Sequence, residues 1–244
     1  MIARSCESKL ENRNSHSVAN VKFLDYRYAP TDGSKEFKMP TSLNTQVLRQ
    51  ALRRIAAKME SCSDELNALD AQLGDGDLGV TMVRGTRAMA SELPQLPDDV
   101  GMALLKCAQA FTKLSGSTYG TLLATGLMSA ARATKGRTEI PWSEVSPLLA
   151  SALQAMAQRS GGKLGEKTVL DALEAVRAAT EGNDDPAALV AAAGQAVGNC
   201  LDRFRNQPAR QGRARIFGEK SVGRDDPGMV AFQRIIEGLE SSDK

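Results

Sequence analysis

The chain has 244 residues, of which 42% are hydrophobic and 25% are charged, and this predicts one globular domain with appendages rather than two full domains. The formal net charge is only +2, so there is no broad basic field of the kind that binds DNA or RNA. No stretch approaches ~18 uninterrupted apolar residues and no short apolar secretory signal opens the chain, so we expect no membrane insertion and a cytoplasmic location.

The cysteine and histidine residues exclude several kinds of site. Cys6, Cys62, Cys107 and Cys200 show no C-x-x-C spacing, which argues against a zinc site and against a disulfide framework, so we expect reduced thiols. The single histidine, His16, lies in a polar N-terminal stretch. The rest of the chain therefore has no histidine for a catalytic triad, a histidine zinc site or a phosphocarrier.

The N-terminal stretch differs from the remainder of the chain. It mixes Asn, Ser, Asp, Lys and Pro with isolated apolar positions and shows no sustained period. Beyond it, apolar residues such as Leu48, Ile55 and Met59 recur at helical spacing. We therefore expect residues 1–44 to be a loosely held polar extension and residues 45–244 to be one helical domain.

Helical patterns alternate with glycines from there to the end of the chain. Aromatic residues make up only 4%, and this composition favours helix over strand, so the predicted class is all-α. Asp185 before Pro186 and Asp226 before Pro227 each place an N-cap acceptor ahead of a proline, which indicates two helix starts. After a helix around Leu48–Met59 and one resuming near Leu66, the predicted helices are Met82–Leu93, Val100–Leu114, Thr121–Thr134, Trp142–Arg159, Thr168–Thr180, Pro186–Arg205 and Pro227–Leu239.

The strongest candidate for chemistry is an acidic, glycine-rich stretch made of Asp70, Gly74, Asp75, Gly76, Asp77 and Gly79. The glycines are expected to break the helix, while Asp75 and Asp77, two apart in an extended segment, project to one side and Asp70 lies one turn back. Three carboxylates so close repel one another unless a divalent cation compensates them, and Mg²⁺ prefers carboxylates, waters and phosphates. A solvated turn remains the alternative.

An EF-hand calcium loop does not fit the same stretch. Such a loop places a glutamate at its twelfth position. Counting from Asp75 reaches Thr86, and counting from Asp70 reaches Thr81. The calcium-loop interpretation is therefore rejected.

Three further loops contain residues suited to binding phosphate. Leu114–Thr121 is a small-residue turn that opens into a helix, Gly161–Thr168 is glycine-rich and cationic, and residues 213–228 concentrate positive charge before a helix N-terminus. Each alone is equally typical of an ordinary capped or solvated loop. No Walker A sequence and no Rossmann glycine fingerprint occurs, so a nucleotide would have to be held by loops at helix ends.

Taken in order, these segments resemble one known family. From about residue 45 to the C-terminus the chain is similar to the L subunit, or nucleotide domain, of dihydroxyacetone kinases. The resemblance implies a barrel or bundle of eight antiparallel helices whose loops at one end bind ADP or ATP through Mg²⁺. The matching segments are Leu69–Asp77, Tyr119–Thr121, Gly165–Asp171, Gly212–Ala214 and Ser221–Gly228.

The resemblance also implies roles for individual residues. Asp70, Asp75 and Asp77 would hold two magnesium ions, and Arg213 would steady the nucleotide during phosphoryl transfer. Leu78 departs from the family, in which histidine or another polar residue is frequent, whereas Thr81 keeps hydrogen-bonding capacity where asparagine is common. The residues implied to line the nucleotide are Leu78, Gly79, Val80, Thr81, Leu114, Ser115, Gly161, Val169, Arg213, Asp226, Pro227 and Gly228.

In the family a separate K subunit or domain binds the sugar through a histidine, and this sequence contains no such domain. The implied reaction is transfer of a phosphoryl group to dihydroxyacetone or a related small ketose held by that partner. Either ATP is used directly, or bound ADP is recharged by a phosphotransferase-system protein. A homodimer is a further assembly to consider.

Two other functions remain open at this point. Related subunits act as non-catalytic, nucleotide-dependent partners of transcription regulators, and the kinase domain of fatty-acid kinase systems shares the aspartate motif. The pattern Asp226-Pro227-Gly228 favours the ketose kinases.

Overall fold

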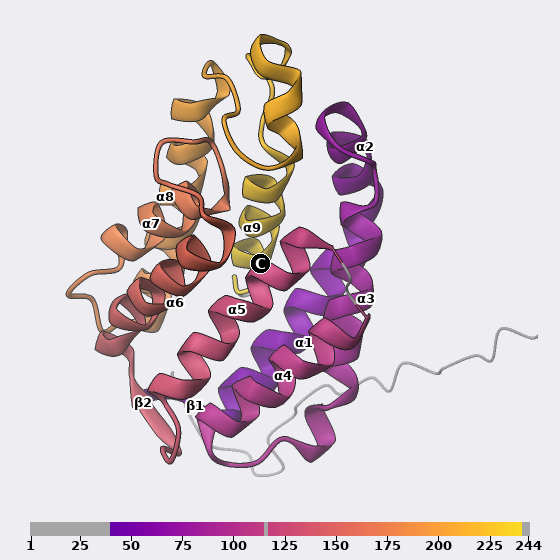
Figure 1. Ribbon diagram of the computed structural model, residues 1–244. Coiled ribbons are helices and arrows are strands. Elements are labelled where there is room, and N and C mark those ends of the chain that lie inside the picture. Colours follow the sequence, from indigo (N-terminus) through magenta and orange to yellow (C-terminus); the bar gives the residue numbers. More distant parts are fainter. Residues whose placement is uncertain (1–39, 115–116, 241–244) are drawn as a thin grey trace, which may run out of the picture. The chain divides into compact units, whose positions relative to one another are not determined.

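The computed structural model describes residues 40–114 and 117–240. Most of the expected N-terminal extension, residues 1–39, and the implied site residue Ser115 lie outside the described residues. The described chain is built almost entirely of helices (Figure 1), and the predicted all-α class is confirmed.

The described residues form nine α-helices, two short strands and three 3-10 helices. The α-helices are α1 (Thr45–Ser61), α2 (Ser63–Leu73), α3 (Leu78–Ser91), α4 (Val100–Leu114), α5 (Thr118–Ala133), α6 (Val145–Ser160), α7 (Val169–Ala179), α8 (Pro186–Arg205) and α9 (Pro227–Glu237). The strands are β1 (Ser42–Asn44) and β2 (Glu139–Pro141), and the 3-10 helices are Leu93–Gln95, Trp142–Glu144 and Arg213–Ser221.

The helix starts agree with the prediction where the sequence shows an N-cap residue. The carboxylates of Asp185 and Asp226 accept hydrogen bonds from the amides of Ala188 (2.7 Å) and Met229 (2.9 Å). Helix α5 begins three residues before the predicted Thr121 because the Ser117 hydroxyl caps it, accepting a hydrogen bond from the Gly120 amide. Short polar N-caps therefore fix these boundaries.

Residues 42–44, assigned by the sequence to the extension, instead form β1, which pairs antiparallel with β2. Asn44 then caps α1, and the Trp142 ring N–H donates a hydrogen bond to the Pro40 carbonyl (2.8 Å). This pairing was not predicted, because strands of three residues are too short to show a period.

The helices pack in a closed order. Helix α1 packs on α3, each helix from α3 to α8 packs on the next, and α9 returns to α1. Eight of the described helices therefore follow one another in a closed order of contacts, which we call the ring. The ninth helix, α2, follows α1 after one residue and packs across α3 and α9.

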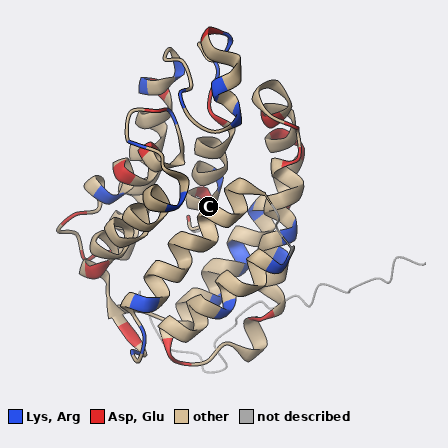
Figure 2. Cartoon of the chain, viewed as in Figure 1, with Lys and Arg blue, Asp and Glu red and all other residues tan. Residues whose placement is uncertain are grey.

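One hydrophobic cluster draws residues from all nine helices. Its fully buried members include Met59, Leu66, Met82, Phe111 and Met229. Charge is sparse on some helices: α5 has a single charged residue, Arg132, and Figure 2 accordingly draws it almost entirely tan. No helix of the described residues is long and apolar enough to cross a membrane.

Three of the four cysteines lie among the described residues. Cys62, Cys107 and Cys200 are buried and free. Burial raises the pKa of all three thiols, that of Cys107 to about 11.

Candidate nucleotide and metal site

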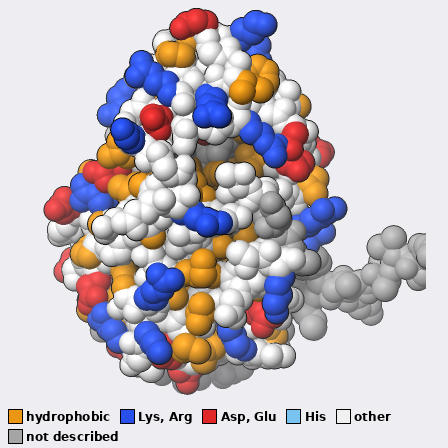
Figure 3. Space-filling view, in the orientation of Figure 1, with side chains coloured by type: hydrophobic (Ala, Val, Ile, Leu, Met, Phe, Trp, Pro, Cys, Tyr) orange, Lys and Arg blue, Asp and Glu red, His pale blue; other side chains and the backbone are white. Residues whose placement is uncertain are grey.

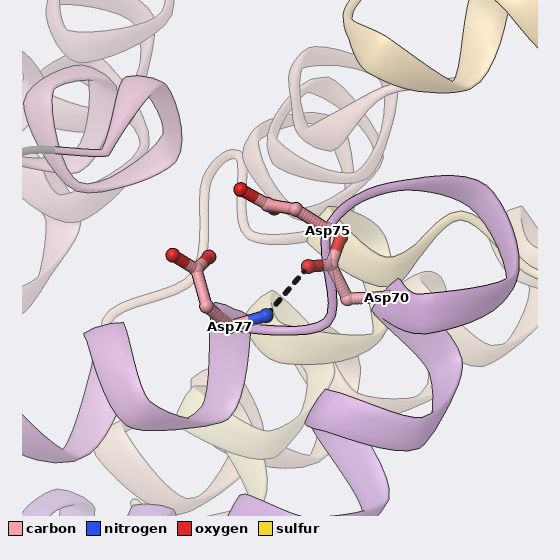
Figure 4. Close-up of side chains that lie close together, drawn as sticks. All are labelled: Asp70, Asp75 and Asp77. Atoms are coloured by element: carbon pink, nitrogen blue, oxygen red, sulfur yellow. Dashed lines mark hydrogen bonds between the residues drawn. The ribbon is translucent and has the colours of Figure 1, made fainter.

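The loop between α2 and α3 brings three carboxylates together. One carboxylate oxygen from each of Asp70, Asp75 and Asp77 lies within 4.8 Å of the others. Asp70 projects from the last turns of α2, Asp75 from the loop and Asp77 from the start of α3, as Figure 4 shows. Asp70 is half-buried, whereas the other two are exposed. The three side chains therefore converge as expected.

The convergence has a different cause from the one predicted. The Oδ2 atom of Asp70 accepts hydrogen bonds from the amides of Gly76 (2.8 Å) and Asp77 (3.1 Å), the second drawn as a dashed line in Figure 4. Gly76 has φ +78°, a conformation that favours glycine. The stretch is therefore a tight turn folded around the Asp70 carboxylate, not the extended segment predicted.

Gly79 does not break a helix, contrary to prediction. It lies in the first turn of α3, against the first residue of α2. A Cβ atom at this position would overlap the backbone carbonyl oxygen of Ser63. Gly79 is therefore required for the close approach of two helix starts.

The three carboxylates differ in their electrostatic surroundings. Burial raises the pKa of Asp70, although the amide hydrogen bonds from Asp77 and Gly76 oppose this. The Arg213 guanidinium hydrogen-bonds and ion-pairs with Asp75, and this holds the pKa of that carboxyl below its usual value. Arg213 thus supplies positive charge to the cluster.

A cavity of about 810 Å³ opens beside the carboxylates. This volume is typical of small-molecule binding sites. In the view of Figure 3, Lys and Arg side chains are spread over the upper and lower parts of the surface, with acidic and hydrophobic side chains among them. The residues that line the cavity are Asp70, Leu73, Asp75, Asp77, Leu78, Ser117, Thr118, Tyr119, Thr121, Leu122, Arg159, Ser160, Thr168, Val169, Leu170, Gln211, Gly212, Arg213, Ala214, Arg215, Ile216, Asp226, Pro227 and Gly228.

Four helices begin at this cavity. Leu78, Thr118, Val169 and Pro227, which are the first residues of α3, α5, α7 and α9, all line it. Consecutive helices of the ring run in alternating directions, so every second one starts at this end. Helix N-termini carry partial positive charge and amide donors, which favour anions such as phosphate. The cavity therefore combines a carboxylate cluster with a surface suited to phosphate.

The start of α9 is fixed to the start of α5. The Tyr119 hydroxyl donates a hydrogen bond to the Gly228 carbonyl (2.8 Å), and a Cβ atom at Gly228 would lie 2.9 Å from the Tyr119 ring. Burial raises the pKa of Tyr119 well above its usual value. Burial also raises the pKa of Asp226, the N-cap of α9, to about 6. This wall of the cavity is therefore closely packed.

The remaining wall comes from residues 206–222, which we call the cap segment. It leaves the end of α8, contains the 3-10 helix Arg213–Ser221 and returns before α9. Ala214 is buried against Leu73 of α2, and the Gln211 side-chain amide donates a hydrogen bond to the Ser160 carbonyl (3.2 Å). The cap segment places Arg213 beside Asp75.

The structure brings most, not all, of the expected site residues to the cavity. Asp70, Asp75, Asp77, Leu78, Val169, Arg213 and Asp226–Gly228 line it. Gly79 and Thr81 are buried within α3, and the Val80 amide donates to the Asn67 side chain (3.2 Å). Gly161 is an exposed left-handed C-cap of α6 next to the cavity residue Ser160. Leu114 ends α4, and its side chain is not described.

Sequence reasoning missed several cavity residues. Arg159 and Gln211 carry no motif of their own: Arg159 reaches the cavity from the end of α6 and Gln211 from the cap segment. Tyr119 and Thr168 were noted as parts of motifs but not as site residues. The capping box between Thr168 and Asp171, readable from their spacing, was the available signal for the start of α7.

The acidic cluster fits a hard divalent cation. All three donors are carboxylates, two of them are exposed, and the cluster opens on a cavity large enough for phosphates and waters. Magnesium uses one or a few carboxylates and keeps waters and phosphate oxygens as its other ligands. The donor set therefore suits Mg²⁺ better than a metal that selects nitrogen or sulfur ligands.

Comparison with known proteins identifies relatives over most of the chain. Residues 72–241 match a family model described as the DAK2 domain. The chain is 31% identical over 183 residues to the PEP-dependent dihydroxyacetone kinase, ADP-binding subunit DhaL, of Escherichia coli, covering 72% of this chain and 87% of that protein. It is 30% identical over 203 residues to L-erythrulose 1-kinase of Mycolicibacterium smegmatis, covering 78% of this chain and 36% of that protein.

A solved structure has the same fold. The dihydroxyacetone kinase from C. freundii in complex with AMP-PNP and Mg²⁺ aligns with a TM-score of 0.63 at 22% identity, covering 94% of this chain and 38% of that chain. The chain thus spans most of the E. coli subunit but little more than a third of the two longer kinases.

Proposed function

The chain belongs to the family of proteins with a DAK2 domain, and from this premise we propose that it is the nucleotide-binding subunit of a two-part kinase of the dihydroxyacetone kinase type. The observation that carries the proposal is the meeting of three carboxylates and four helix N-termini at one cavity. Carboxylates alone repel a nucleotide, and helix N-termini alone bind any small anion. Together they select a phosphate chain that brings a divalent cation with it.

Individual residues have distinct roles in this proposal. Asp70, Asp75 and Asp77 hold Mg²⁺, which supplies charge neutralisation at the phosphate oxygens when it is bound. Arg213 donates hydrogen bonds to the phosphates, and Asp226–Gly228 with Val169 contact the rest of the nucleotide. The protein thus contributes positioning and electrostatic stabilisation rather than a covalent step.

The phosphoryl acceptor is dihydroxyacetone or a related small ketose held by a separate K subunit. The printed names of two relatives, a dihydroxyacetone kinase subunit and an L-erythrulose 1-kinase, support a ketose of three or four carbons. The described residues contain no histidine with which to hold the sugar in the manner of the family. The proposal therefore places the ketose site on the K subunit.

The phosphoryl donor separates two versions of the proposal. The E. coli relative is named as PEP-dependent and ADP-binding, which supports bound ADP that is recharged by a phosphotransferase-system protein. Identifying the nucleotide released from the purified protein distinguishes the two. Retained ADP supports the phosphotransferase-linked version, and rapid exchange with preference for ATP supports direct use of ATP.

Thermal unfolding with and without Mg²⁺ and ADP or ATP tests the proposal. A ligand that binds only the folded state raises Tm, by an amount equivalent to about 2.7 kcal/mol at a hundredfold excess over Kd. Asp75→Ala and Asp77→Ala should abolish this rise and leave the unliganded protein folded, because both side chains are exposed on a loop. Asp184→Ala, an exposed aspartate far along the chain, is the control. Equal stabilisation of all three variants by Mg²⁺ and nucleotide would contradict the metal assignment.

A further inference from the structure

Lys167 is buried although it is charged. It follows the glycine-rich loop after α6, its side chain is 1% exposed, and its φ of +61° is the only positive value of a non-glycine residue among those described. A left-handed backbone and a buried ammonium are both unfavourable, so the surrounding contacts have to compensate them. The contacts show where this compensation comes from.

Three backbone carbonyl groups surround the Lys167 ammonium. Its Nζ atom donates hydrogen bonds to the carbonyl oxygens of Arg205 (3.1 Å), Gln207 (2.8 Å) and Ser221 (2.9 Å). An ammonium group has three donors, whereas a neutral amine has two. The three carbonyl groups thus match the three donors of the protonated form.

The three acceptors lie at the two ends of the cap segment. Arg205 and Gln207 stand where it leaves α8, and Ser221 stands where it returns. We call the place where these two ends meet the neck of the cap segment. Two further hydrogen bonds close it, from the Gly223 amide to the Arg205 carbonyl (2.8 Å) and from the Ala209 amide to the Ser221 hydroxyl (2.8 Å). Lys167 therefore joins both ends of a loop whose middle carries Arg213.

Other contacts of the cap segment are the hydrogen bonds from the Gln211 side chain to the Ser160 carbonyl and from the Arg210 amide to the Glu166 carbonyl, and the ion pair between Arg213 and Asp75. Its hydrophobic contacts belong to a separate small cluster of Leu73, Ala209 and Ala214, with Phe217 packed against it. Because this cluster is small, polar contacts, those at the neck among them, add to what holds Arg213 over the cavity. The residue after Lys167, Thr168, lines that cavity and caps α7.

We propose that Lys167 is a positioning residue for nucleotide binding, which acts by closing the neck of the cap segment and so holding Arg213 at the phosphate-binding end of the cavity. This inference rests on the proposed function, because its main readout is nucleotide affinity. Lys167 does not touch the ligand itself.

A double-mutant cycle tests this inference. The Kd for ADP with saturating Mg²⁺ is measured for the wild type, Lys167→Met, Arg213→Ala and the double variant. Lys167→Met should raise Kd at least tenfold in the wild-type background and less than twofold when Arg213 is already absent. Lys220→Met, which removes an exposed positive charge from the same segment, should leave Kd within twofold of wild type.

Trypsin cleavage measures how easily the cap segment opens. The cap segment and its neck contain Arg205, Arg210, Arg213, Arg215, Lys220 and Arg224. Trypsin should cleave the Lys167→Met variant in this segment at least tenfold faster than the wild type. Lys167→Arg, which keeps the charge, should restore part of the protection. Ser221→Ala, which loosens the neck from its other side, should give a smaller change of the same kind and serves where Lys167→Met does not fold.

The outcomes separate this inference from the proposed function. A wild type without any Mg²⁺-dependent ADP binding refutes the proposed function, while the trypsin result still tests the neck. Wild-type ADP binding with an unchanged Kd in Lys167→Met overturns the inference alone. An equal increase of Kd with and without Arg213 also overturns it, because Lys167 would then act independently of Arg213.

Discussion

Arg213 lies beside Asp75, at the position proposed for the metal ion. Its guanidinium pairs with that carboxylate, and its pKa is raised by the hydrogen bond to Asp75 and by the charges of Asp77 and Asp70. In the proposed complex the same three carboxylates face Mg²⁺. Arg213 and the metal ion therefore compete for one anion in the absence of nucleotide and cooperate once phosphates are present.

Arg213→Ala should have opposite effects on two ligands. Mg²⁺ alone should bind several-fold more tightly, because Asp75 loses its competing partner. ADP with Mg²⁺ should bind at least tenfold more weakly, because the phosphates lose a charged donor. Isothermal titration calorimetry measures both, with Lys220→Ala as a control that removes an equal charge from the same 3-10 helix, outside the residues that line the cavity. Weaker binding of Mg²⁺ alone would contradict the competition.

Asp226 makes the free energy of unfolding depend on pH. Burial raises its pKa from 3.8 to about 6, with Lys167 and Asp171 acting in opposite directions. The folded protein binds this proton more tightly than the unfolded chain does. The contribution of Asp226 to the free energy of unfolding is therefore fully present below about pH 4 and is lost as pH rises through about 6. Asp226→Asn keeps an N-cap acceptor but removes the titration.

Urea unfolding of both proteins without nucleotide measures the Asp226 effect. Relative to Asp226→Asn, the wild type should lose on the order of 1–3 kcal/mol between about pH 4 and about pH 7. Carboxylates with lowered pKa contribute the opposite slope, but equally in both proteins, so the difference isolates Asp226; they are Glu65, Asp75, Asp99, Glu144 and Glu174. Parallel curves would show that Asp226 ionises as freely as in the unfolded chain.

At the scale of elements, the contact between α2 and α3 controls the acidic loop. The Gly79 position leaves no space for a side chain against the Ser63 backbone, whereas Gly198 in α8 has open space around it. The loop with the three carboxylates joins these two helices, so their spacing sets its geometry.

Two glycine-to-alanine substitutions should therefore change stability in opposite directions. Gly79→Ala should lower the free energy of unfolding by roughly 2–4 kcal/mol, because backbone has to move. Gly198→Ala should raise it by about 0.5–1 kcal/mol, because alanine favours helix and meets no neighbour. Chemical denaturation measures both. A stable Gly79→Ala protein with unchanged magnesium binding would show that the helix contact does not control the loop.

Much of the element structure could be predicted from the sequence, and the exceptions have physical causes. Apolar spacing and caps predicted Val100–Leu114 and Pro186–Arg205 residue for residue, because both helices have a long buried face. Strand β1 was missed because its pairing partner is about a hundred residues away. The 3-10 helix Arg213–Ser221 was read as a charged loop, since its geometry depends on contacts at the neck rather than on a period.

The candidate site was predictable in part for the same reason. Asp70, Asp75 and Asp77 are close in sequence, so local turn chemistry brings them together. Arg213 and Asp226 reach them across more than a hundred residues, which only the resemblance implied. Lys167 gave no signal of its burial, because its three acceptors are backbone carbonyls that any residue type supplies.

At the scale of the whole helical unit, the closed order of helices determines what the cavity offers. Contact of α9 with α1 completes the ring, and the Lys58–Glu237 ion pair (2.7 Å) bridges the two helices. Surface pairs of this kind contribute little, so burial in the shared core has to hold the closure. Tertiary order of this kind is not readable from helical periods, which specify a buried face but not the neighbour that covers it.

The alternating direction of the ring helices limits how this architecture can be lengthened or shortened. Adding or deleting a single helix between α3 and α9 would reverse every later one, and carbonyl ends would replace amide ends at the cavity. Adding or deleting a hairpin of two helices preserves the direction of all the others. Engineered insertions and deletions in this domain should therefore be made in even numbers of helices.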